Sequence, residues 1–153
     1  MRVLLDTNVV ARLLPREGST SHLALAEAIA QLRSEKHELF LVPQVLYEFW
    51  VIATRSHEQN GFGLLPAAAS QDVQRLEELF SVLRDERTVL DHWRSLVVQH
   101  AVVGKGAHDA RLVAAMIRHR LTHLMTFNLT DFKRYPMIGL LDPAEFPAAK
   151  LGT

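Results

Sequence analysis

Short apolar runs alternate along the chain with longer segments of helical periodicity. A brief apolar run bounded by polar residues predicts a strand that is buried on both faces. Such runs occur at residues 3–5, 39–42, 123–127 and 138–141, and a weaker strand is predicted at 88–90. Strands that alternate with helices form right-handed crossovers and a parallel sheet. The pattern therefore predicts an α/β protein with three α/β/α layers and a mostly parallel central sheet.

Helix signals fill the segments between these strands. Ser70, Asp91 and Asp109 are predicted N-caps, because their side chains accept hydrogen bonds from the free N–H groups of a first turn. Residues 57–69 contain two glycines and a proline and are predicted to form a loop. The predicted helices cover residues 7–14, from 19–21 to about 37, 43–54, 70–83, 93–103 and 109–120.

Composition limits the class of protein. A length of 153 residues with 48% hydrophobic content predicts one well-cored domain, at 1–145, followed by a short tail at 146–153. The 17 basic and 17 acidic residues cancel, so any binding of a polyanion must be local. The absence of cysteine excludes disulfides, thiolate catalysis and zinc–sulfur sites. No apolar stretch reaches the ~18 residues that span a bilayer. We expect a cytoplasmic protein without a membrane segment.

Glu48 is the most informative single residue. It is the only charged residue in the apolar run 44–54, which reads as a buried helix. An uncompensated carboxylate in such a segment costs several kcal/mol. The sequence leaves two forms of compensation open, which are an Arg or Lys partner and a metal ion shared with other carboxylates.

Three aspartates are placed so that they can join Glu48. Asp6 ends the first predicted strand, and Asp131 lies just past the strand at 123–127. Sites in parallel sheets form beyond the carboxyl ends of the strands. Asp109 heads the helix that feeds the latter strand, which places it at the opposite end unless the start of the helix reaches round. Each also has a structural interpretation, as an N-cap for Asp6 and Asp109 and as a turn residue for Asp131.

Clustered carboxylates without cysteine or an obvious histidine set favour a hard cation. Mg²⁺ and Mn²⁺ take oxygen ligands, keep several waters and are shared between a few carboxylates and substrate phosphates. Such ions activate water and neutralise charge on a phosphodiester. Without metal, repulsion between the carboxylates should raise the pKa of one or more of them.

Four blocks of sequence follow one another along the chain: Leu5-Asp6-Thr7-Asn8, Glu48, His108-Asp109-Ala110-Arg111 and Thr126-Phe-Asn128-Leu-Thr-Asp131-Phe132. In this order they closely resemble the PIN-domain ribonucleases. Within these, the chain resembles VapC, the toxin of bacterial type II toxin–antitoxin pairs, over about residues 1–145. The resemblance implies a PIN-like fold and a Mg²⁺- or Mn²⁺-dependent endoribonuclease. It also implies a homodimer or higher homo-oligomer and a small VapB-like antitoxin as partner.

The same resemblance assigns roles to individual residues. Asp6, Glu48 and Asp109 match the family's three core acids, as catalytic residues and metal ligands. The fourth catalytic position is left open, because Asn128 falls at the family's last position while Asp131 follows one turn later. Asn8, Thr126 and Asn128 match polar residues that orient the acids.

Six basic residues flank the acidic blocks and are candidates for contacts with RNA phosphates. They are Arg12, Arg16, Lys105, Arg111, Lys133 and Arg134. Two alternatives are weighed against a nuclease. The pair His108-Asp109 also occurs in HD-type phosphohydrolases, but that fold is entirely helical and the strand signals argue against it. The second alternative is a PIN scaffold without catalysis that acts by binding RNA or a protein partner.

Overall fold

The structure is a computed structural model that describes residues 1–146. Within this range it contains one sheet of five parallel strands, in the order β3-β2-β1-β4-β5. Residue 146 apart, the predicted C-terminal tail at 146–153 lies outside the described residues. The strands are β1 (Arg2–Leu5), β2 (Glu38–Leu41), β3 (Ser81–Val82), β4 (His123–Met125) and β5 (Gly139–Leu141). The predicted three-layer α/β/α fold is confirmed.

The central strand β1 explains why the apolar runs are continuous. Leu4 pairs with Phe40 of β2 on one side and with Leu124 of β4 on the other. Val3, Leu4 and Leu5 are completely buried, because helices cover both faces of the sheet. One backbone hydrogen bond of 3.0 Å, from the Asp6 N–H to the Met125 carbonyl, extends the pairing to the carboxyl end of β1.

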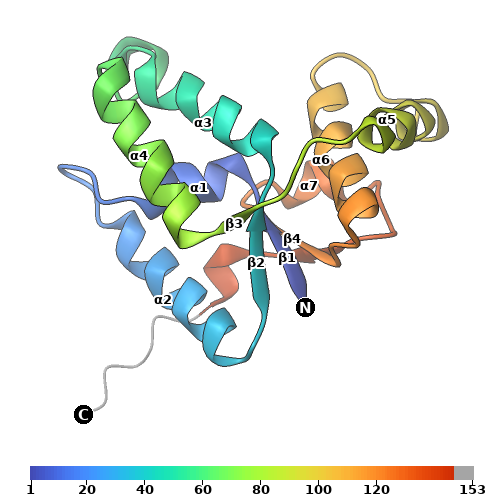
Figure 1. Ribbon diagram of the computed structural model, residues 1–153, viewed down its shortest axis with the longest axis horizontal. Helices are drawn as coiled ribbons and strands as arrows, with labels where there is room; N and C mark the ends of the chain where they lie inside the picture. Colours follow the sequence, from blue (N-terminus) through green and yellow to red (C-terminus); the bar gives the residue numbers. More distant parts are fainter. Residues whose placement is uncertain (147–153) are drawn as a thin grey trace.

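Helices lie on both sides of the sheet (Figure 1). From β1 the chain leads outward through β2 to β3 at one edge of the sheet. Because crossovers are right-handed, the helices on this path, α1 to α4, cover one face. The chain then returns to β4 on the other side of β1, so α5 to α7 cover the opposite face. The helices are α1 (Thr7–Leu13), α2 (Ser21–Ser34), α3 (Pro43–Thr54), α4 (Pro66–Leu79), α5 (Arg87–Gln99), α6 (Gly106–His119) and α7 (Leu129–Phe132), with 3-10 turns at His57–Gln59 and Pro143–Glu145.

Three helix starts differ from the prediction. Helix α4 begins at Pro66 and not at Ser70, because proline lacks only an N–H that a first turn leaves free in any case. Asp91 is not a cap, since it lies inside α5. Asp109 is also not the cap, since it lies in the first turn of α6, which begins at Gly106.

Two secondary-structure predictions between residues 80 and 90 are wrong, one of a helix and one of a strand. Ser81–Val82 forms the edge strand β3, although the sequence predicts helix there. Residues 88–90 are helical instead of extended, because Val89 and Leu96 lie on one buried face of α5. This seven-residue spacing is helical, and packing of α5 against α6 overrides the strand preference of a short apolar run. Helix α5 ends at Gln99 and not at Val103.

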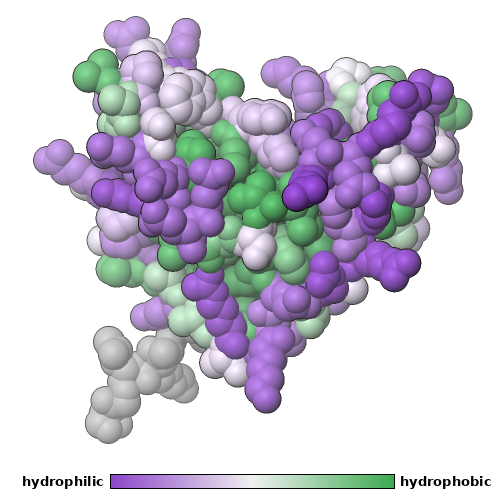
Figure 2. Space-filling model, viewed as in Figure 1, coloured by the Kyte–Doolittle hydropathy of each residue, from purple (hydrophilic) through white to green (hydrophobic). Residues whose placement is uncertain are grey.

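The surface has one further feature that bears on function. Helix α3 was expected to be buried, but it leaves Tyr47, Trp50 and Val51 exposed. Figure 2 shows apolar side chains in the middle of one face, between the two groups of helices.

Among the described residues, no helix has the length and apolar character needed to cross a bilayer.

Candidate functional site

Three acidic residues from separate elements line one pocket of about 380 Å³. Asp6 follows β1, Glu48 lies in α3, and Asp109 lies in the first turn of α6. Of the two ends of the sheet that the sequence leaves open for Asp109, the structure places it at the same end as Asp6 and Glu48. A helix that precedes a parallel strand must run antiparallel to it, so the start of α6 lies at the carboxyl ends of the strands. The sheet topology therefore brings all three carboxylates to the edge where sites form.

Asp6 is both a helix cap and a member of this pocket. Its Oδ1 accepts a hydrogen bond of 2.7 Å from the Thr7 N–H, at the start of α1. Its Oδ2 accepts hydrogen bonds from the Thr126 hydroxyl (2.7 Å) and the Asn8 amide (3.2 Å). Burial raises the pKa of Asp6 and the charge of Glu48 adds to the increase, while the Thr126 and Thr7 hydrogen bonds oppose it.

Asn8 and Thr126 form a rigid frame around Asp6. The Asn8 amide nitrogen donates to the Thr126 hydroxyl oxygen at 3.1 Å, and its amide oxygen accepts from the Phe127 N–H at 3.2 Å. The same hydroxyl oxygen accepts the Asn128 N–H at 3.0 Å. Since the Thr126 hydroxyl proton is given to Asp6, this frame joins the ends of β1 and β4 and fixes the orientation of the carboxylate.

Glu48 is compensated by hydrogen bonds instead of by a cation. Its Oε2 accepts the Thr7 hydroxyl at 2.6 Å, and its Oε1 accepts the Gln44 amide at 2.9 Å. The side chain is partly exposed, and within residues 1–146 it makes no salt bridge. The salt-bridge alternative considered for Glu48 is therefore absent from this part of the chain, and its charge remains available to a ligand.

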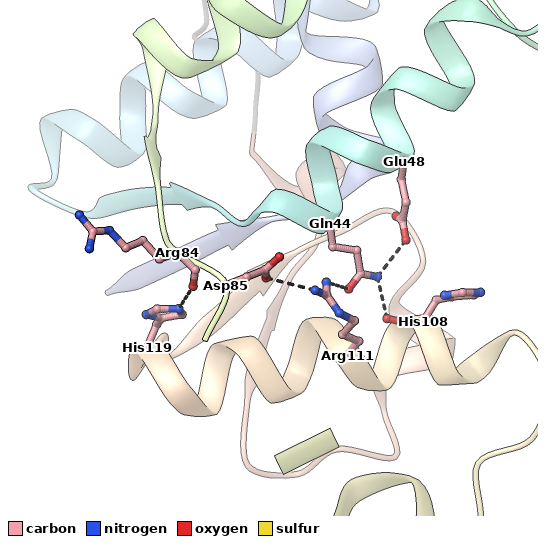
Figure 3. Close-up of polar contacts among 7 residues, drawn as sticks. All are labelled: Gln44, Glu48, Arg84, Asp85, His108, Arg111 and His119. Atoms are coloured by element: carbon pink, nitrogen blue, oxygen red, sulfur yellow. Dashed lines mark hydrogen bonds and ion pairs between the residues drawn. The ribbon is translucent and has the colours of Figure 1, made fainter. Parts of the chain in front are cut away.

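Gln44, which the sequence analysis missed, joins α3 to α6 (Figure 3). Its amide nitrogen donates to Glu48 and also to the His108 carbonyl, at 2.9 Å. Its amide oxygen accepts from Arg111 at 2.9 Å, and Arg111 in turn pairs with Asp85 at 3.1 Å. Both amide hydrogens and the oxygen of this buried side chain are thus in use. The only signal in the sequence is a glutamine one turn before Glu48.

Asp109 is the electrostatically strained member of the group. Within residues 1–146 its carboxylate makes no hydrogen bond or salt bridge. Burial, and then the charges of Asp6, Asp131 and Glu48, raises the pKa of Asp109 from 3.8 to about 6, against a small opposing effect of His108. A cation in the pocket would lower the pKa of Asp109 again, because it would offset the negative charges around this carboxylate.

Asn128 and Asp131 occupy different places. Asn128 lines the pocket that holds Asp6, Glu48 and Asp109. Asp131 is exposed and accepts a hydrogen bond from the Asn128 amide. It lines an adjoining pocket of about 260 Å³, where Asp109 forms the common wall.

The predicted basic residues also separate into groups. Lys105 and Arg134 line the adjoining pocket beside Asp109 and Asp131. Arg16 and Arg111 are held elsewhere by carboxylates, at 2.8 Å from Asp72 and 3.1 Å from Asp85 respectively. Arg12 donates to the Asn8 carbonyl and stacks on Phe127, and Lys133 is exposed. The acidic pocket itself contains a cation that the sequence analysis missed, Arg55.

The donor set fits a divalent cation in an open site. Within residues 1–146 no three His, Asp or Glu side chains form a ready-made metal cage. Mg²⁺, however, keeps several waters and is held by one or two carboxylates together with substrate phosphates. Asp6, Glu48 and Asp109 supply carboxylates of the right chemistry, Asn128 adds an amide, and the Asp109 carboxylate has no hydrogen-bond or salt-bridge partner within residues 1–146.

Comparison with known proteins identifies the family. A model of the PIN domain matches residues 3–137, so the chain belongs to the PIN-domain family. No curated protein matches it. Among solved structures, VapBC2 from Rickettsia felis, bound to a DNA fragment from their promoter, has a TM-score of 0.67 and 16% identity over 92% of this chain and 98% of that chain.

Two further solved structures share the fold. VapBC-1 from nontypeable Haemophilus influenzae has a TM-score of 0.66 and 18% identity, over 95% of this chain and 100% of that chain. Mycobacterium tuberculosis VapC20, a toxin that cleaves the sarcin-ricin loop, has a TM-score of 0.55 and 19% identity, over 80% of this chain and 86% of that chain. At these identities the likeness establishes the fold alone.

Proposed function

We propose that this chain is a metal-dependent endoribonuclease of the VapC type, the toxin of a type II toxin–antitoxin pair. The observation that carries the proposal is the meeting of Asp6, Glu48 and Asp109, from three separate elements, in one pocket at the carboxyl edge of a PIN-domain sheet. VapC20, which shares the fold, is an RNA-cleaving toxin.

The carboxylates of Asp6, Glu48 and Asp109 hold Mg²⁺ or Mn²⁺ in this proposal. When bound, such an ion activates water and neutralises charge on the phosphodiester. The protein supplies orientation: Asn8 and Thr126 fix Asp6, and Gln44 fixes Glu48. Such fixed groups cost no reorganisation when charge develops.

The fourth position is shared between two residues. Asn128 lies in the pocket with the three acids and acts beside the metal. Asp131 forms the outer wall of the site, where its charge acts on Asp109 and where it accepts the Asn128 amide. Lys105 and Arg134 line the adjoining pocket and contact the phosphates of the bound RNA.

The proposed partners follow from the fold and the surface. The solved neighbours from R. felis and H. influenzae are VapBC structures, which supports a VapB-like antitoxin. The exposed Tyr47, Trp50 and Val51 on α3 support self-association through this helix, because exposed apolar patches often mark interfaces. We place the PIN domain at 1–145 and the protein in the cytoplasm.

The test is cleavage of single-stranded RNA by the purified chain with Mg²⁺ or Mn²⁺, with EDTA as the control. Asp6→Asn keeps the size of the side chain but removes its charge, and it should reduce cleavage by at least ~10²-fold. The matched control is Asp91→Asn, on the exposed surface of α5, which should cleave like wild type. RNA binding without cleavage by the wild-type protein in either metal would favour the inactive scaffold.

A further inference from the structure

We infer that Arg55 binds a phosphate of the RNA backbone inside the acidic pocket, and that the loop at 57–64 holds it in place. The inference rests on the proposed function and adds a residue that contacts the substrate. Among the described residues that line the pocket, Arg55 is the one with a positive charge. It lies seven residues after Glu48, two helical turns further along α3.

The pocket extends along α3 toward Arg55. Val51, Ile52 and Arg55 line it in addition to the acids, so it reaches from Glu48 to the C-cap of the helix. Arg55 nevertheless makes no salt bridge within residues 1–146. Arg55 thus lines the same pocket as the three carboxylates but is paired with none of them, and its guanidinium is available to an anion from outside.

The following loop folds back over the end of α3. The N–H groups of residues 62, 63 and 64 donate to the carbonyls of Ile52, Arg55 and Ala53 respectively, each at 2.9 Å. These bonds satisfy carbonyls that a helix end leaves free. The loop is therefore fixed to the helix by its own backbone, and it surrounds Arg55 before α4 begins.

Gly61 shows how closely the loop encloses Arg55. A Cβ atom at this buried glycine would lie 2.1 Å from the Arg55 carbonyl oxygen and 2.2 Å from its Cγ. No side chain fits at such distances, so glycine is required for the loop to close on the arginine. At the far end of the side chain, Nη2 donates to the Asn60 carbonyl at 3.2 Å.

This arrangement fixes the stem of Arg55 and one nitrogen, but the rest of the guanidinium makes no hydrogen bond to the part of the chain that the structure describes. Nε is buried and makes no hydrogen bond within residues 1–146. Unpartnered buried donors are rare in proteins. A guanidinium presents its donors in a planar fork that matches two phosphate oxygens, and holding the fork in advance lowers the cost of binding.

The direct test is binding of a short single-stranded RNA in EDTA, which prevents metal-dependent cleavage. Each phosphate contact contributes a slope of about −0.7 to the dependence of log K on log salt. Arg55→Gln should therefore reduce the magnitude of the slope by about 0.7 and weaken binding at low salt at least about tenfold. The RNA affinity of Arg55→Lys should lie between those of Arg55→Gln and wild type, because lysine keeps the positive charge but lacks the planar fork of donors. The control is Arg94→Gln, an exposed arginine on α5.

The outcomes separate this inference from the proposed function. Unchanged RNA affinity and salt slope in Arg55→Gln, an equal loss in Arg94→Gln, or no binding by wild type overturns the inference. If Arg55→Gln melts at a lower temperature than wild type, a second variant separates direct contact from loss of structure. Arg55→Ala is then assayed for RNA binding with added guanidinium ion. Recovery of binding supports direct contact with the phosphate, and no recovery contradicts it. Arg55-dependent binding without cleavage contradicts only the nuclease proposal, and cleavage without Arg55-dependent binding contradicts only this inference.

Discussion

The apo protein should become more stable when Asp109 loses its charge. Its pKa is raised from 3.8 to about 6 by burial and by three neighbouring carboxylates. At about 1.4 kcal/mol for each pH unit, the difference corresponds to about 3 kcal/mol of destabilisation at neutral pH. The side chain is partly exposed, and solvent screening reduces this to about 1–2 kcal/mol. Asp109→Asn should recover that amount, which is about 2–8 °C in melting temperature for a domain of this size.

The sign of the pH dependence follows from the direction of the shift. Because the folded protein binds this proton more tightly than the unfolded chain, the stability of the wild type falls as pH rises from about 4 to about 6. The difference between Asp109→Asn and wild type should therefore be full above pH 6 and disappear toward pH 4. Subtracting the two unfolding curves at each pH removes the contributions of other groups.

The assay is urea unfolding in EDTA between pH 4 and 8, with the exposed Asp91→Asn as the control. Equal free energies of unfolding for Asp109→Asn and wild type at pH 7.5 would refute the electrostatic reasoning. A difference in free energy that does not change with pH would refute it as well. With Mg²⁺ present, the wild type should become more stable than Asp109→Asn. The ion binds most tightly to the folded protein that keeps the Asp109 carboxylate, and this binding stabilises the fold.

The remaining predictions concern the other pocket residues. Glu48→Gln should reduce RNA cleavage at least ~10²-fold. Its melting temperature should change little, because the substitution leaves no buried cation without a partner. A loss of several kcal/mol in stability would instead indicate a hidden ion pair. Gln44→Leu should lower the free energy of unfolding by about 1–3 kcal/mol, since it leaves buried partners unpaired, and denaturant titration measures this directly. Asn128→Ala should reduce cleavage more than Asp131→Asn, and wild-type rates in both would restrict the site to the three acids.

The sequence predicted the strands best where packing agrees with local preference. The run from Val3 to Leu5 was correctly predicted as a buried strand, whereas the strand prediction at 88–90 is wrong, because the partner that makes Val89 helical is α6. The position of Asp109 was left open for a similar reason, since it depends on the direction in which α6 crosses the sheet.

The three acids of the candidate site were predictable, and the resemblance to PIN domains also pointed to Asn8 and Thr126, which hold Asp6, but nothing pointed to Gln44. Asp6 stands out as a charge at a strand end, Glu48 as a charge in an apolar helix, and Asp109 as the residue that heads a predicted helix. Gln44 reaches His108 and Arg111 across 64 and 67 residues of sequence. Contacts of that separation leave no local pattern, so only the folded structure brings them to light.

The most direct test of the central claim is metal binding measured by the melting temperature of the wild type, Asp6→Asn and the control Asp91→Asn. A divalent ion that binds only the folded acid site stabilises by about 2.7 kcal/mol at a hundred times its dissociation constant. Saturating Mg²⁺ or Mn²⁺ should therefore raise the melting temperature of the wild type and the control by several degrees, and that of Asp6→Asn by much less. An equal increase in all three proteins, or none in the wild type, would contradict a metal site formed by these carboxylates.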